Sequence, residues 1–164
     1  MSNPPLWVFL VLAALVVLGL RQTQPGTMSR GRLLLVPLVM AALSFSALSR
    51  LFGLSVLPVL AWAVGVLVPV VLRRPLLRQP GAAFSASRQV FEVQGSWLPL
   101  LLMLSIFALR FVATAGVHVD PDLATSTAFA TVMAAAFGLP SGVFVARALL
   151  ILGTAYGPRK VLVA

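Results

Sequence analysis

The sequence predicts an all-α fold, a polytopic membrane helix bundle of about five transmembrane helices in a single domain over residues 1–164. Composition is the first reason, since 60% of the residues are hydrophobic and only 9% are charged. A soluble domain averages roughly 45–50% apolar and about 25% charged residues. The second reason is that the apolar residues gather in segments close to the roughly 17–25 residues of a spanning helix. A lipid bilayer is therefore expected to cover the apolar surface.

The expected spans follow one another with short connections. The first five residues carry no positive side chain, and the apolar run after them reaches Arg21 without a small-residue cleavage pattern. We interpret this run as a first membrane helix rather than a cleaved signal. The approximate spans are residues 5–20, 33–48, 55–72, 97–116 and 127–146, the last with a continuation to 154 left open.

The charges of the loops set the expected orientation. The chain has 12 Lys and Arg residues against three acids, and cytoplasmic loops of membrane proteins collect Lys and Arg. With five spans, residues 21–32, 73–96 and 155–164 share one side and hold nine of the basic residues. This bias predicts an outer N-terminus and an inner C-terminus in the inner membrane of a bacterium. A four-span alternative, in which the first or third segment fails to cross, would scramble the segregation.

The long loop 73–96 supports two interpretations. Its residues 82–94 could form an interfacial helix on the cytoplasmic face, or its arginines could contact anionic lipid head groups from an irregular loop. The bilayer is the expected partner in both cases. The positive-inside rule accounts for the net charge of +9 without a nucleic-acid partner. A homo-oligomer or another membrane protein is an open alternative partner.

One helix-packing stripe lies in the last expected span. Small residues recur there at every fourth position, so they fall on one helix face. Such stripes let helix backbones approach closely in lipid, where no hydrophobic force drives helices together. The stripe predicts close packing against another helix of the same chain, with a second copy of the chain as the alternative. Its members are Ala130, Ala134, Gly138, Gly142 and Ala146.

Two arginines and three acids are candidate functional or ion-pairing residues. Arg110 lies six residues before the end of the fourth span, and Arg147 directly follows the fifth span. A charge inside a bilayer is unfavourable by about 2.5–3.5 kcal/mol on insertion scales, although both side chains can snorkel to an interface. Asp120 and Asp122 lie beyond the outer end of the fourth span, near Arg110. Glu92 lies on the side to which Arg147 points, so the acids are either partners of arginines or solvated loop residues.

The chain offers little to an enzyme. It has no cysteine, which excludes disulfides, thiolate metal sites and cysteine catalysis. Its one histidine, His118, cannot build a zinc site alone. The serines lack a neighbouring base, and no acid lies inside an expected span. We therefore expect no catalytic, cofactor-binding or metal-binding residue, no cofactor and no enzymatic activity.

Three short motifs carry a resemblance to known proteins. They are Leu6-Trp7-Val8 at the start, Arg21…Pro25 after the first span, and Ser29-Arg30-Gly31-Arg32-Leu33-Leu34-Leu35-Val36-Pro37 entering the second. In these motifs, and over most of its length, the chain resembles a family of small multi-pass bacterial inner-membrane proteins of unknown function. The resemblance implies a membrane location and adds no activity.

Two functions follow as expectations. The leading one is a non-enzymatic structural, accessory or assembly subunit, because the chain has a packing stripe and few buried polar groups. The alternative is a small transporter-like or permeation protein for a small, anionic solute. Arg110, Pro140 and a weak repeat between residues 44–48 and 105–109 motivate that alternative. The first is favoured because a solute pathway usually needs more polar lining.

Overall fold

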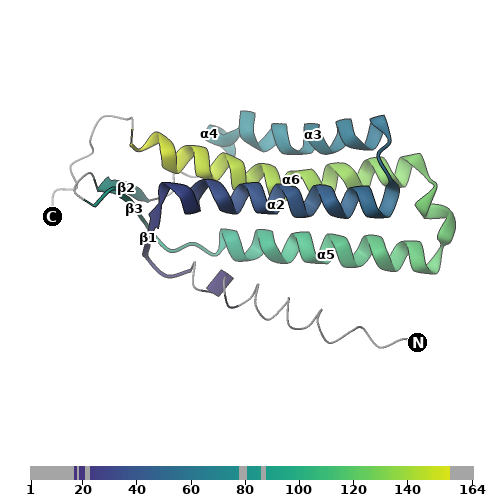
Figure 1. The fold of residues 1–164 in the computed structure, drawn as a ribbon, viewed down its shortest axis with the longest axis horizontal. Helices are drawn as coiled ribbons and strands as arrows, with labels where there is room; N and C mark the ends of the chain where they lie inside the picture. The colour runs from purple at the N-terminus through teal and green to yellow at the C-terminus, as the bar shows by residue number, and fades with distance from the viewer. Residues whose placement is uncertain (1–16, 18, 21–22, 78–80, 86–87, 156–164) are drawn as a thin grey trace.

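The computed structural model describes residues 17, 19–20, 23–77, 81–85 and 88–155 (Figure 1). The long helices of this part of the chain are α2 (Arg30–Phe52), α3 (Val56–Val71), α5 (Leu98–Val119) and α6 (Thr127–Gly153). A four-residue helix, α4 (Arg73–Leu76), follows α3, and a 3-10 turn, η1 (Pro121–Ala124), joins α5 to α6. Apart from residues 17, 19 and 20, the first expected span, 5–20, lies outside the described residues.

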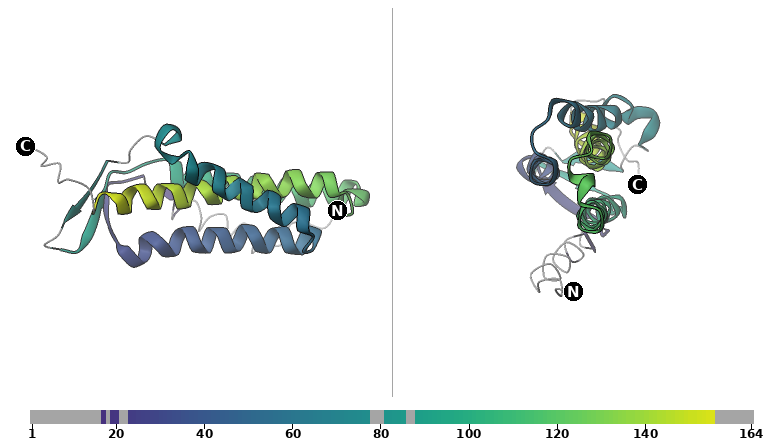
Figure 2. Two further views of the ribbon diagram at one scale, coloured as in Figure 1. Left: turned by 90° about the horizontal axis from the view of Figure 1, so that it is seen from above. Right: turned by 90° about the vertical axis from the view of Figure 1, so that its right-hand side faces the viewer.

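Helix α6 lies at the centre of the bundle, with α2, α3 and α5 packed against it (Figures 1 and 2). Helices α2 and α5 begin at one end of the bundle, and α3 and α6 finish there, so helices adjacent in sequence are antiparallel. Gly53 closes α2 with a φ of +71°, a conformation that favours glycine. Its amide donates to the Ser49 carbonyl oxygen at 3.1 Å, and the chain then reverses into α3.

Three of the described helices are long and apolar enough to cross a membrane: α2, α5 and α6, with 23, 22 and 27 residues. Helix α3 is also apolar but has 16 residues, or about 24 Å at 1.5 Å per residue. The last four expected spans each fall on one of these helices, so the predicted helical bundle is confirmed in its coarse form. Helix α2 begins three residues early because the Ser29 hydroxyl accepts a hydrogen bond from the Arg32 amide at 3.4 Å.

A small antiparallel sheet at one end of the bundle corrects the all-α prediction. Its strands are β1 (Gly26–Ser29), β2 (Ala82–Ser85) and β3 (Val90–Val93), in the order β1-β3-β2. Of the two interpretations of this loop, the interfacial helix over 82–94 is therefore wrong, and residues 82–85 and 90–93 form strands where the other interpretation expected an irregular loop. Phe91 and Val93 are buried while Glu92 is exposed, which is the two-residue period of a strand. Strand β1 precedes α2 in the chain, so α2 and α3 separate it in sequence from β3. It nevertheless pairs with β3 and places Met28 beside Phe91, a pairing that no local sequence pattern predicts.

The sheet covers the end of the bundle through an apolar cluster. Leu33 of α2 packs there with Phe91 and Val93 of β3, and with Ala148 and Ile151 of α6. We call this the sheet end, and the opposite end, which carries η1, the far end. The cluster fixes the start of α2 and the finish of α6 against the same strand.

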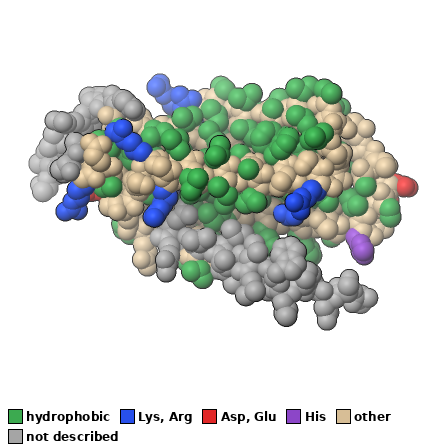
Figure 3. Space-filling view, in the orientation of Figure 1, with side chains coloured by type: hydrophobic (Ala, Val, Ile, Leu, Met, Phe, Trp, Pro, Cys, Tyr) green, Lys and Arg blue, Asp and Glu red, His purple; other side chains and the backbone are tan. Residues whose placement is uncertain are grey.

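The outer surface of the helices is strongly apolar. Large hydrophobic side chains are exposed along α2, α3 and α5, and Figure 3 shows hydrophobic side chains across the upper and middle parts of the visible face. Most of the Lys and Arg side chains visible in that view gather toward the sheet end. The exposed apolar residues include Leu34, Leu35, Leu38, Leu57, Leu60, Val64, Leu67, Leu101, Phe111 and Val112.

Candidate functional site

The small-residue stripe of α6 is enclosed by the bundle. All of its members are buried, and Ala134 and Ala146 have no exposed surface. Helix α6 makes its most extensive contact with α3, followed by α2. Packing within the chain therefore occupies the face that the stripe forms. The buried members are Ala130, Ala134, Gly138, Gly142 and Ala146.

The closest helix contact joins the backbones of α3 and α6. A Cβ added at Gly138 would lie 3.0 Å from the Cα of Gly65 and closer still to the Trp62 carbonyl oxygen. A Cβ added at Gly142 would meet the Val66 carbonyl oxygen in the same way. Glycine on both helices therefore permits a contact that any side chain would block. Figure 2 shows α3 crossing α6 obliquely at this contact.

A buried polar cluster ties three helices together beside the stripe. The Trp62 indole Nε1 of α3 donates to the Ser44 Oγ of α2 at 3.0 Å, and the Ser141 Oγ of α6 donates to the same oxygen at 2.9 Å. Ser44 in turn donates to the Ala41 carbonyl oxygen at 3.0 Å. Both serines have no exposed surface. We call Ser44, Trp62 and Ser141 the serine node.

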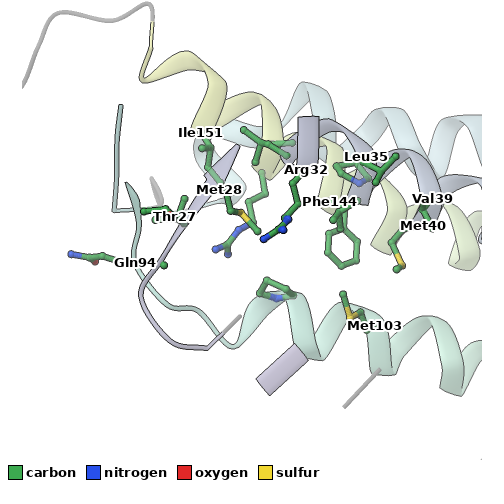
Figure 4. Close-up of a pocket in the computed structure, with 18 of the residues that line it drawn as sticks. Thr27, Met28, Arg32, Leu35, Val39, Met40, Gln94, Met103, Phe144 and Ile151 are labelled. Carbon is green, nitrogen blue, oxygen red and sulfur yellow. The ribbon is translucent and has the colours of Figure 1, made fainter. Parts of the chain in front are cut away.

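A cavity of about 610 Å³ lies toward the sheet end, between α2, α5 and α6 (Figure 4). Its polar lining lies beside β1 and β3 at the sheet end, and its apolar lining continues along α2, α5 and α6. The serine node lies further toward the far end, since Ser44 and Ser141 are four and three residues beyond the lining residues Met40 and Phe144. The apolar lining includes Leu35, Val39, Met40, Met103 and Phe144, and the polar lining includes Gln24, Thr27, Arg32, Gln94 and Arg147.

Two arginines line this cavity. The Nη1 of Arg147 donates to the Ser96 Oγ at 2.9 Å, and the same oxygen accepts from the Leu98 amide at 3.2 Å. One hydroxyl thus connects α6 to the start of α5. Arg32 extends into the cavity from the first turn of α2 (Figure 4). No Asp or Glu is among the described lining residues, so the cavity combines two positive charges with apolar walls.

The other candidate residues lie away from this cavity. Arg110 is exposed on α5, near the far end. Asp120 Oδ1 accepts from the Asp122 amide at 3.2 Å and so caps η1. Glu92 is exposed on β3, on the face opposite the apolar cluster, whereas Arg147 bonds to a serine. Among the described residues, Asp120 thus bonds to a backbone amide and Arg147 to a serine hydroxyl, and neither bond is the ion pair that the sequence suggested.

The described residues hold no cluster of three or more His, Asp or Glu side chains that could bind a metal ion. His118 is exposed near the end of α5.

An apolar helix bundle with long helices and one basic end is typical of multi-pass membrane proteins. The chain belongs to a family of unknown function, DUF6622, whose sequence profile matches residues 1–159. The expected membership of an uncharacterised family is thereby confirmed. No curated protein and no solved structure matches the chain.

Sequence reasoning missed the residues that the fold brings together. Ser44, Trp62 and Ser141 are polar or amphipathic side chains inside apolar helices, and such residues usually find partners in a bundle. That signal could have selected these three residues, but it contains no information on which of them pair. The sequence did not mark Arg32 or Ser96 as site residues. Arg32 lies in the first turn of α2 and Ser96 just before α5, and polar residues are common at such positions.

Proposed function

We propose that the chain is a non-enzymatic structural, accessory or assembly subunit of the bacterial inner membrane. The observation that carries this proposal is how the interior is filled. Helix α6 contacts α3 backbone to backbone, and the polar side chains of the serine node satisfy one another. None of α2, α3, α5 and α6 contains Asp or Glu. Such an interior favours a rigid scaffold over a catalytic centre or a proton relay.

Five spans with an outer N-terminus and an inner C-terminus are part of the same proposal. Among the described residues, Arg50, Asp120 and Asp122 lie at the far end and Arg110 lies toward it on α5, while the other six arginines lie toward the sheet end. The positive-inside rule then favours a cytoplasmic sheet end. The sheet-end arginines are Arg30, Arg32, Arg73, Arg74, Arg88 and Arg147.

Helix α3 has to cross the bilayer if its neighbours do. It starts where α2 finishes and returns the chain to the end where α5 begins. Its length of about 24 Å is less than the roughly 30 Å of a hydrocarbon core. Local thinning of the bilayer and snorkelling of flanking residues accommodate such a mismatch, and Arg73 and Arg74 directly follow α3.

Permeation of a small anionic solute is the second candidate function. The arginine-lined cavity favours it, because two guanidinium groups without a described carboxylate attract anions. The serine node and the glycine contact between α3 and α6 favour the first candidate, since they fill the bundle beyond the cavity.

The two candidates predict different behaviour after mild extraction from native membranes. A subunit migrates in an assembly of defined stoichiometry that is larger than the 17.3 kDa chain, and the purified chain in liposomes carries no phosphate, sulfate or acetate flux. Native electrophoresis and solid-supported-membrane currents measure these properties. A lone chain that carries anion current would overturn the subunit proposal.

A further inference from the structure

The cavity at the sheet end has a polar end and an apolar end, and its apolar residues Leu35 and Val39 are also exposed on the outer surface of α2. Arg32 lies in the first turn of α2, and Val39 and Met40 lie seven and eight residues further along the same helix. At 1.5 Å per residue, the apolar wall therefore continues for about 10–12 Å beyond the charge. Small-molecule pockets have volumes of about 300–1,000 Å³, and this cavity, at about 610 Å³, falls in that range.

Arg147 has hydrogen-bonding capacity left over in the cavity. A guanidinium carries five N–H donors, and the bond that the structure records for this side chain goes to Ser96. No buried side-chain nitrogen or oxygen among the described residues lacks a partner, so the other donors of Arg147 reach accessible space. The accessible space beside this side chain is the cavity that it lines.

Arg32 and its neighbour Arg30 place their guanidinium groups in different surroundings. The Arg30 guanidinium carbon lies 5.1 Å from the centre of the Phe84 ring, a cation–π contact on the sheet. Arg32 instead extends into the cavity, as Figure 4 shows. Two guanidinium groups from α2 and α6 thus face a common space, with Met40 and Met103 as adaptable apolar lining beyond them.

We propose that this cavity binds an anionic phospholipid, with its phosphate between Arg32 and Arg147 and an acyl chain along Leu35, Val39 and Met40. Arginine suits phosphate because its planar donors can form two parallel bonds to one group. The apolar wall favours a lipid over a free anion, because a small anion has no apolar part that could contact the wall. The inference rests on the membrane placement proposed above, which puts the arginine-lined end of the cavity at the cytoplasmic head-group level.

Lipid retention by the isolated full-length chain tests this site. The delipidated protein is titrated with phosphatidylglycerol, or with phosphatidylcholine of the same acyl chains, and bound lipid is counted by native mass spectrometry. We expect one phosphatidylglycerol to bind tightly and phosphatidylcholine to bind about tenfold more weakly. Arg32→Gln and Arg147→Gln should each weaken phosphatidylglycerol binding about tenfold, the loss typical of one charge-assisted hydrogen bond.

Two further variants separate the site from general electrostatics. Arg74→Gln removes the same charge from an exposed position at the same end and should bind as the parent chain does. Met40→Trp keeps every charge but fills the apolar part of the cavity, so it should also lose the lipid. Circular dichroism confirms that each variant is folded before binding is compared.

Three results would overturn the lipid site. The first is equal binding of the two lipids, and the second is an equal loss in Arg74→Gln and Arg147→Gln. The third is displacement of the lipid by glycerol phosphate at similar concentration, which would make the cavity a site for free anions. Because retention is measured on the isolated chain, and the subunit role by complex size in native membranes, each proposal can fail separately.

Discussion

The hydroxyl of Ser141 donates to the hydroxyl of Ser44 across 2.9 Å, although 97 positions separate the two residues in the chain. The Ser44 oxygen also accepts the indole N–H of Trp62, so one atom connects α2, α3 and α6. A hydroxyl oxygen has two lone pairs, and both are used here. In a membrane bundle, where apolar side chains gain little by leaving lipid, such bonds help to define which helices pack together.

Removal of the shared acceptor should destabilise the bundle. Ser44→Ala leaves the Trp62 N–H without its recorded partner inside the bundle, and an unsatisfied buried donor lowers stability by about 1–3 kcal/mol. Ser141→Ala should have a smaller effect, on the order of 0.6 kcal/mol, because Ser44 then still accepts from Trp62. Unfolding in detergent, followed by circular dichroism, measures both differences.

Ser105→Ala is the matched control for these variants. Ser105 is half-buried on α5 and donates to the Leu102 carbonyl oxygen of its own helix at 2.8 Å, so no second helix depends on it. The Ser105→Ala substitution should change the free energy of unfolding by less than about 0.5 kcal/mol. Equal effects of Ser44→Ala and Ser105→Ala would contradict a role of the serine node in holding α2, α3 and α6 together.

A single methyl group at the helix contact should also destabilise the bundle. Gly138→Ala places a Cβ against the backbone of Gly65 and Trp62, and backbone cannot move aside as a side chain can. Overpacking of this kind lowers stability by about 1–3 kcal/mol, and Gly138→Leu should be worse. Gly31→Ala, where nothing lies within 4 Å of the added Cβ, is the control. Unchanged thermal unfolding of Gly138→Ala would show that the helices separate easily.

Arg110 should tolerate substitution. Its side chain is exposed near the far end of α5, so Arg110→Lys should behave as the parent chain, since lysine also snorkels. Arg110→Leu should change the free energy of unfolding by less than about 0.5 kcal/mol. Expression level and detergent unfolding measure both variants. A folded Arg110→Leu variant that loses a cellular phenotype would instead make Arg110 a functional residue.

The absence of cysteine makes the orientation directly testable. Thr27→Cys at the sheet end and Thr125→Cys at the far end are matched exposed positions in a chain without other thiols. With the sheet end in the cytoplasm, a membrane-impermeant maleimide should label Thr125→Cys in intact spheroplasts and Thr27→Cys only after lysis. Reporter fusions at Met1 and Ala164 extend the test to both termini. The reverse labelling pattern would refute the outer N-terminus and inner C-terminus.

The sequence by itself determined the helical class and the positions of the helices that the structure describes. Runs of apolar residues near the length of a bilayer leave few alternatives to helices, because backbone groups in lipid must bond within their own segment. The spacing of four residues between Ala134, Gly138 and Gly142 likewise predicted a packing face, since that period is a property of the helix itself.

Tertiary structure alone decided which residues meet. The stripe could not name α3 as its partner, because Gly65 is one of several glycines and only the folded chain brings it to Gly138. The strand pairing of Met28 with Phe91, and the meeting of Arg32 with Arg147 in one cavity, join segments that local periodicity treats separately. Contacts between distant segments depend on the order and direction in which helices pack, and a one-dimensional pattern does not contain that information.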